Sequence, residues 1–155
     1  YISSEFDNVD GDGISGSVSA AVAPNIAVNA SYTTISYDFD TDVDSLSLGV
    51  EFHTPIAPGT DFVAGINYLD AEITDSFFGS ADDTGNVLTG GIRHELSNTV
   101  ELEARIVRVD IFDETDTGFA VAGLMDITGT PVQVGLGFSD IGEETSLEIG
   151  VRFNF

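Results

Sequence analysis

The chain has 155 residues, with 27 acidic residues against four arginines, no lysine and a formal net charge of −23. This balance excludes nucleic acid as an expected partner, because phosphate binding needs clustered Lys or Arg. The absence of cysteine excludes disulfides and thiolate metal sites. Hydrophobic residues make up 42% of the chain, which is too many for an acidic disordered tail. Length and composition therefore predict one domain over residues 1–155.

Apolar and polar residues alternate along most of the chain, and this period of two predicts β-strands. The clearest case is the final segment, SLEIGVRFNF at 146–155. No apolar run is long enough for a transmembrane helix. In chain order, the predicted strands are Tyr1–Val9, Gly13–Val22, Ile26–Phe39, Ser45–His53, Asp61–Thr74, Asn86–Leu96, Val100–Phe112, Gly118–Ile127, Val132–Ser139 and Thr145–Phe155.

The connections between the predicted strands alternate in charge. The first and every second one after it are acidic, such as DFDTDVD at 38–44, and the others are short and nearly uncharged, such as TGTP at 128–131. In an up-and-down meander, successive connections lie at opposite ends of the sheet. The sequence therefore predicts acidic loops at one end of the molecule and tight turns at the other.

Two kinds of all-β fold fit this pattern. In a soluble, halophilic β-sandwich the apolar parity faces a core, whereas in an outer-membrane barrel it faces lipid and the polar parity lines the lumen. The polar parity is rich in Gly, Ser and Thr, which suits a confined interior, and the acids gather at one end. Both features favour the barrel over the sandwich, which stays the second alternative.

The arginines test this choice, because an Arg on the lipid face at the midplane costs about 2–4 kcal/mol. Arg93, Arg105 and Arg152 fall on the polar parity of their strands, and Arg108 falls on the apolar parity near the acidic end, where water is accessible. We therefore predict a closed antiparallel up-and-down transmembrane β-barrel of ten strands, with eight strands as the alternative, since closed barrels of this class have even strand numbers.

The end of the chain resembles the C-terminal strand of bacterial outer-membrane proteins, with Val151, Phe153 and Phe155 on one parity. The whole pattern resembles the small OmpA/OmpX-like barrels of Gram-negative cell surfaces, often called porin-family proteins. The resemblance implies that these three residues are the signal for the barrel-assembly machinery and that the other partners are membrane lipid and lipopolysaccharide. The chain departs from the family in its ten predicted strands and its lack of tryptophan. Phe and Tyr would then form the aromatic girdle, at Phe52, Phe62, Tyr68, Phe153 and Phe155.

Enzymatic activity is not expected. The two histidines, His53 and His94, lie next to Glu51 and Glu95, and a His–carboxylate pair there indicates an interior hydrogen bond rather than a catalytic dyad. The chain contains no G-x-S-x-G or H-E-x-x-H motif.

The acidic connections contain weak candidates for a metal site. Asn8, Asp10, Asp12 and Gly13 match the first half of a calcium loop, but Ser19 stands where the bidentate Glu is expected. Asp38, Asp40 and Asp42 have similar spacing without the turning glycine. We expect no specific cofactor, with diffuse Ca²⁺ or Mg²⁺ at the acidic loops as the alternative.

Charges on the polar parity predict an ion-pair network inside the lumen, because buried charges need partners. The predicted members are Glu51, Arg93, Glu95, Glu101, Glu103, Arg105, Glu148 and Arg152. Small barrels usually fill their interior with side chains, so the network is expected to plug the lumen. The resulting hypothesis is an outer-membrane barrel with a structural or surface-interaction role and acidic extracellular loops. A small cation-selective pore is the alternative, because acids outnumber arginines on this parity.

Overall fold

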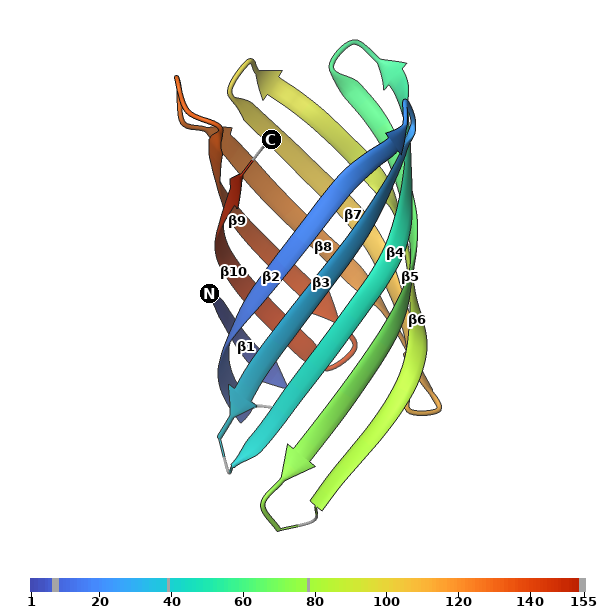
Figure 1. Ribbon diagram of the computed structural model, residues 1–155, viewed down its shortest axis with the longest axis vertical. Helices are drawn as coiled ribbons and strands as arrows, with labels where there is room; N and C mark the ends of the chain where they lie inside the picture. Colours follow the sequence, from blue (N-terminus) through green and yellow to red (C-terminus); the bar gives the residue numbers. More distant parts are fainter. Residues whose placement is uncertain (7–8, 39, 78, 154–155) are drawn as a thin grey trace.

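The protein is a closed antiparallel barrel of ten strands, seen in a computed structural model (Figure 1). The structure describes residues 1–6, 9–38, 40–77 and 79–153, with only the backbone at 152 and 153. This part of the chain contains no helix long and apolar enough to cross a membrane. The strands are β1 (Ile2–Phe6), β2 (Val9–Ala23), β3 (Ile26–Tyr37), β4 (Thr41–Ala57), β5 (Thr60–Asp75), β6 (Gly79–Ser97), β7 (Val100–Ile111), β8 (Glu114–Asp126), β9 (Val132–Ile141) and β10 (Glu144–Phe153).

Each strand pairs with its neighbours in sequence, and β1 pairs with β10 to close the barrel. The ten-strand prediction is thus confirmed. The β1–β2, β3–β4, β5–β6, β7–β8 and β9–β10 hairpins lie at one end, the lower end in Figure 1, and the other four lie at the opposite end. We name these the acidic end and the short-turn end.

The prediction of acidic loops is wrong for many of the described acids, because these acids continue the strands, whereas Asp38, Asp40, Asp113 and Glu143 lie in turns. Asp10 and Asp12 belong to β2, Asp42 belongs to β4, and β6 already begins at Gly79. The long strands β4, β5 and β6 have 17, 16 and 19 residues, whereas about 9–11 residues cross a bilayer. The additional residues of these strands lie toward the acidic end. There β4 and β5 stay paired without interruption from Ser45↔Ala71 to Thr41↔Asp75.

Apolar side chains cover the outside of the barrel in its short-turn half. The outward residues of neighbouring strands lie side by side in the ladders, as in the pairs Leu48↔Tyr68 and Ile66↔Leu88. An outward apolar band of this kind faces lipid in transmembrane barrels. This apolar belt consists of Ile14, Val18, Val28, Tyr32, Leu46, Leu48, Val50, Phe52, Phe62, Ile66, Tyr68, Leu88, Ile92, Leu102, Ile106, Phe119, Val121, Leu136, Leu147 and Ile149.

The apolar residues change sides toward the acidic end. On β7, Ile106 faces outward with 61% of its surface exposed, while the next residue, Val107, faces inward with 6% exposed. From this point Arg108 and Asp110 take the outward positions. The acidic half therefore has a water-facing outside and an apolar inside, like a soluble barrel. This packing explains why strands rather than loops form here: alternate residues still have an interior to fill.

Four inward apolar residues of the acidic half are buried. Ile2, Ile35, Ala71 and Val107, from β1, β3, β5 and β7, are each at most 8% exposed. We name these four residues the apolar seal. Ser4 and Ser146 are also buried in this half. Ser146 donates a hydrogen bond to Ser4, and both hydroxyls donate to Glu144 Oε1. The prediction of a polar inward parity is therefore wrong for this half of the barrel.

Strand β1 closes only the acidic half of the seam between β2 and β10. Its ladder runs from Phe6 to Ile2, which pairs with Gly13 on one side and Glu148 on the other. Tyr1 adds two backbone bonds with Ile149. Beyond this level, β2 pairs only with β3 and β10 only with β9 among the described residues.

Candidate functional site: the lumenal ion-pair cluster

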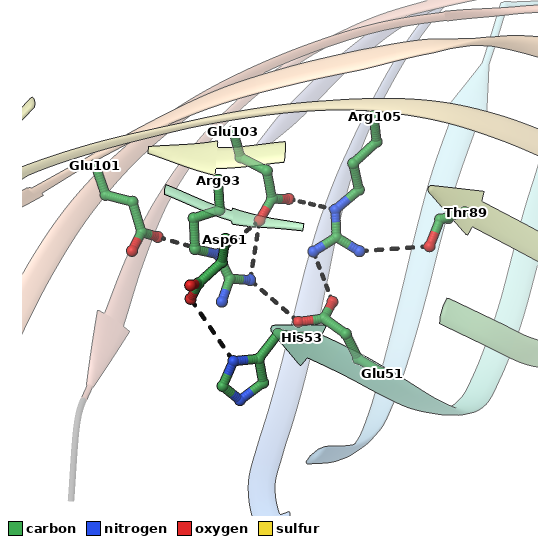
Figure 2. Close-up of polar contacts among 8 residues, drawn as sticks. All are labelled: Glu51, His53, Asp61, Thr89, Arg93, Glu101, Glu103 and Arg105. Carbon is green, nitrogen blue, oxygen red and sulfur yellow. Dashed lines mark hydrogen bonds and ion pairs between the residues drawn. The ribbon is translucent and has the colours of Figure 1, made fainter. Parts of the chain in front are cut away.

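Charged side chains meet inside the short-turn half of the barrel (Figure 2). They come from the inward parity of three strands, with Glu51 on β4, Arg93 on β6, and Glu101, Glu103 and Arg105 on β7. In this half the outward parity is apolar, so the strand alternation directs each of these polar side chains into the lumen. The structure thus brings together five of the eight residues predicted to form the network.

Glu51 is shared by both arginines. Arg93 Nη2 lies 3.1 Å from Glu51 Oε1, and Arg105 Nη2 lies 2.6 Å from Glu51 Oε2. Because each carboxylate oxygen serves a different guanidinium, the interaction joins β4 to β6 and β7 across the lumen (Figure 2).

Glu103 is shared in the same way. Arg93 Nη2 lies 2.9 Å from Glu103 Oε2, and Arg105 Nε donates a short bond to Glu103 Oε1. Glu101 adds a longer contact, 3.5 Å from its Oε1 to Arg93 Nε, and Arg105 Nη1 donates to Thr89 Oγ1 at 3.4 Å. Two arginines therefore hold three glutamates in one connected network.

The cluster is only partly desolvated. Its side chains retain between 16% and 27% of their surface exposed. Charges at this depth are stabilised mainly by pairing, because leaving a carboxylate or a guanidinium unpaired in a dry interior is costly. Charge-assisted Arg–carboxylate bonds are also among the stronger hydrogen bonds. The arrangement can hold three strands together and narrow the lumen at this level.

Both histidines have partners other than the predicted ones. His53 Nδ1 lies 3.6 Å from Asp61 Oδ2, rather than against Glu51 (Figure 2). His94 Nδ1 bonds to Thr60 Oγ1 at 2.8 Å, rather than to Glu95. Asp61 lies on the inward parity of the neighbouring strand, close to His53. Thr60 lies directly opposite His94 in the β5–β6 ladder, whereas the side chains of His94 and Glu95 point to opposite faces of the sheet.

Three predicted members lie apart from the cluster. Glu95 is exposed at the short-turn mouth and has no ion-pair partner among the described residues. It lines a cavity of about 340 Å³ with Glu101, Asp126 and Gln133. Glu148 is exposed on β10, and the side chain of Arg152 lies outside the described part of the chain. The prediction of one eight-residue network is therefore too broad.

The predicted metal candidates are spread over the outside of the acidic end. Asp10, Asp12 and Asp38 line a shallow hollow with Ser3 and Ser36, and Asp12 accepts a hydrogen bond from the Tyr1 hydroxyl. Asp40 lies in a turn, and Asp42 is exposed on β4. Within the described residues, no group of three His, Cys, Asp or Glu side chains could hold a metal ion. Asn8 lies outside these residues.

The predicted assembly signal is described only at Val151, which is 61% exposed on β10. Phe155 and the side chain of Phe153 lie outside the described residues. Of the predicted girdle, Phe52, Phe62 and Tyr68 are exposed on the outer face.

Sequence reasoning expected His53 inside the barrel but paired it with Glu51 instead of Asp61, and it missed Asp61 as a contributor to the lumen. Asp61 stands on the polar parity of its strand, opposite Arg93 in the β5–β6 ladder, so the alternation alone was a sufficient signal. It also missed the apolar seal, because the inward parity was expected to be polar throughout, whereas Ile35 and Val107 are apolar and buried.

Comparisons with known proteins support the fold. No protein-family model and no curated protein matches the chain. Among solved structures, a KdgM porin matches 100% of this chain and 97% of its own, with a TM-score of 0.53 and 11% identity. A KdgM porin in complex with disordered oligogalacturonate matches with the same values. An anion-selective porin from Comamonas acidovorans matches 97% of this chain and 52% of its own, at a TM-score of 0.44 and 12% identity. The chain therefore has the fold of a porin-type barrel, and the narrower OmpA/OmpX-like resemblance stays a prediction.

Proposed function

We propose that the protein is a non-enzymatic barrel of the bacterial outer membrane whose lumen is closed, and that it acts through its outer surface. The apolar seal carries this proposal. Ile2, Ile35, Ala71 and Val107 come from four strands around the barrel and are nearly inaccessible to water. An aqueous path would expose inward side chains at every level, as in wide porins.

The Arg–Glu cluster supports closure at a second level. It joins three strands across the lumen through Glu51 and Glu103. The two layers differ in chemistry and exposure. The residues of the apolar seal are at most 8% exposed, whereas the charged side chains of the cluster are 16% to 27% exposed. We regard the apolar seal as the main barrier and the charged cluster as a brace.

The surface that remains for interactions is the acidic end. We propose that it faces the exterior, because long strands and hairpins of outer-membrane barrels are usually extracellular. A structural or surface-binding role follows, with lipopolysaccharide, the barrel-assembly machinery and diffusely bound Ca²⁺ or Mg²⁺ as the expected partners. Divalent ions would reduce repulsion among neighbouring carboxylates.

A small cation-selective pore is the second candidate. The cluster region contains Glu51, Asp61, Glu101 and Glu103 against two arginines, so the lumen is acidic on balance. One of the similar solved structures, a KdgM porin, is in complex with an oligogalacturonate, which is polyanionic. A polyanionic ligand is not expected in this lumen, because Arg93 and Arg105 are both already held by carboxylates.

Planar-bilayer recording of the refolded protein under a salt gradient tests the two candidates. We expect stable insertion without conductance steps. The double variant Ile35→Ala/Val107→Ala thins the seal and leaves the charges intact, so it is expected to open small conductance steps. A matched variant, Ile106→Ala/Leu102→Ala, removes apolar groups from the outer face and should stay closed. Cation-selective steps in the natural protein that weaken in Glu101→Gln or Glu103→Gln would instead establish the pore.

A further inference from the structure

His53 has an unsatisfied polar atom inside the lumen. Its Nδ1 has no hydrogen-bond partner among the described residues, although Asp61 Oδ2 lies 3.6 Å away. That distance is too long for a hydrogen bond and short enough for an ion pair. From this geometry we propose that His53 and Asp61 form a proton-responsive contact that tightens when His53 is protonated, and that it responds only to the pH on the short-turn side of the membrane.

The charged cluster beside His53 is acidic on balance. Asp61 on β5 contacts His53, and the neighbouring cluster consists of Glu51 on β4, Arg93 on β6, and Glu101, Glu103 and Arg105 on β7 (Figure 2). Four carboxylates against two guanidinium groups give a net charge of −2 with neutral His53 and −1 with protonated His53. A proton therefore reduces the charge imbalance of the cluster and adds a partner for Asp61.

Histidine is the side chain that ordinarily changes charge between pH 5 and 8. The backbone around His53 is already fixed, since its N–H donates to Asn25 O at 3.0 Å and Asn25 Nδ2 donates to its carbonyl at 2.9 Å. The ring is thus the part that can respond. Protonation makes both ring nitrogens donors, and a shift of well under 1 Å would close the gap to Asp61.

Water and protons are expected to reach His53 and Asp61 from the short-turn side of the membrane only. The side chains of His53 and Asp61 are each 32% exposed, so water reaches them in the short-turn half. The apolar seal separates them from the acidic end. One-sided access therefore rests on the proposed closure of the lumen, whereas the proton-responsive contact does not.

A double-mutant cycle tests the contact. His53→Gln, Asp61→Asn and the combined variant are unfolded with urea in detergent micelles at pH 5.5 and at pH 8.0. We expect a coupling of about two- to fivefold in the unfolding equilibrium constant at pH 5.5, in the range of partly exposed ion pairs, and none at pH 8.0. Equal coupling at both pH values, or none at either, would overturn the contact.

His94 supplies the matched control, because its Nδ1 already bonds to Thr60 at 2.8 Å. A cycle of His94→Gln with Asp61→Asn should show no coupling at either pH. Coupling there equal to that of His53 would mean that the effect is a general response to charge and would overturn the specific contact.

The absence of cysteine makes the sidedness measurable. A single-cysteine variant, His53→Cys, is inserted into vesicles and treated with a membrane-impermeant thiol reagent added on one side or the other. Thr99→Cys and Ser36→Cys, both exposed, mark the short-turn and acidic ends. We expect His53→Cys to react only from the side that labels Thr99→Cys. Reaction from the acidic side without conductance would overturn one-sided access alone, and conductance steps would overturn the closure itself.

Discussion

Arg105 of β7 reaches Glu51 of β4 at 2.6 Å, across the width of the two intervening strands. Neighbouring strands in a sheet lie about 4.8 Å apart, so this contact crosses the inside of the barrel rather than following its wall. The ion pair links β4 and β7, two strands that are not hydrogen-bonded neighbours in the sheet, and so braces the barrel from inside.

Loss of this brace should be measurable. Replacing Glu51 by Gln leaves two partly buried guanidinium groups short of a partner, and we expect a loss of about 1–3 kcal/mol, between the values for exposed and buried pairs. Urea unfolding in micelles measures it. Asp110→Asn breaks the exposed pair with Arg108 and should cost less than about 1 kcal/mol. Similar losses in both variants would contradict the bracing role.

The apolar seal should contribute more to stability than the outer face does. Ile35 is 8% exposed inside the acidic half, and truncation of a buried Ile to Ala costs about 2–5 kcal/mol. Ile35→Ala is therefore expected to lower the free energy of unfolding in that range, measured by urea titration. Ile106→Ala, on the lipid-facing side, leaves no interior cavity and should cost less. A reversed order would mean that the acidic half is not packed inside.

The position of the membrane can be tested with charge. Leu48 lies in the apolar belt, so Leu48→Arg is expected to destabilise the barrel in lipid vesicles by about 2–4 kcal/mol if it lies near the midplane. Asp70 also faces outward but lies at the edge of the belt on β5, opposite Leu46. Asp70→Arg should be neutral or stabilising. Equal effects of the two arginines would place the membrane boundary elsewhere.

The inside of the acidic half is too narrow for added atoms at Gly85. A Cβ there would lie 2.0 Å from the carbonyl oxygen of Asp110, so the backbone of β6 or β7 would have to move. We expect Gly85→Ala to lower the yield of folded barrel, read from heat-modifiable migration in gels. Gly90→Ala meets nothing within 4 Å and should fold normally. Normal folding of both variants would show that the interior yields easily.

Cations should stabilise the acidic end. Asp44 lies opposite Glu72, and Glu72 opposite Asp82, in adjoining ladders, and like charges directly opposite each other are destabilising. We expect Mg²⁺ to raise the thermal midpoint more than NaCl of equal ionic strength does, and the triple variant Asp44→Asn/Glu72→Gln/Asp82→Asn to lose this difference. An equal response to both salts would indicate screening alone.

The alternation of residues was enough to predict the strand number, the closed antiparallel topology and the inward direction of Glu51, Arg93 and Arg105. These features depend only on the period of two and on the cost of placing a charge in lipid. The network partners were harder to assign. Glu95 and Glu101 lie directly opposite each other in the β6–β7 ladder, yet of these two only Glu101 forms an ion pair with Arg93. Strand alternation gives both residues the same direction and so could not distinguish them.

The acidic half was misread because charge was taken as a sign of loops. In DFDTDVD the outward residues Asp42 and Asp44 resemble a loop, while Val43 between them faces inward. Only the closed sheet provides an interior at that level for Val43, Ile35 and Val107 to fill. The sequence by itself determined that the chain forms a strand meander with one charged end, since alternation is a local property. The tertiary structure decided which inward residues meet and where water is excluded, because both depend on barrel closure and on the register between strands distant in sequence.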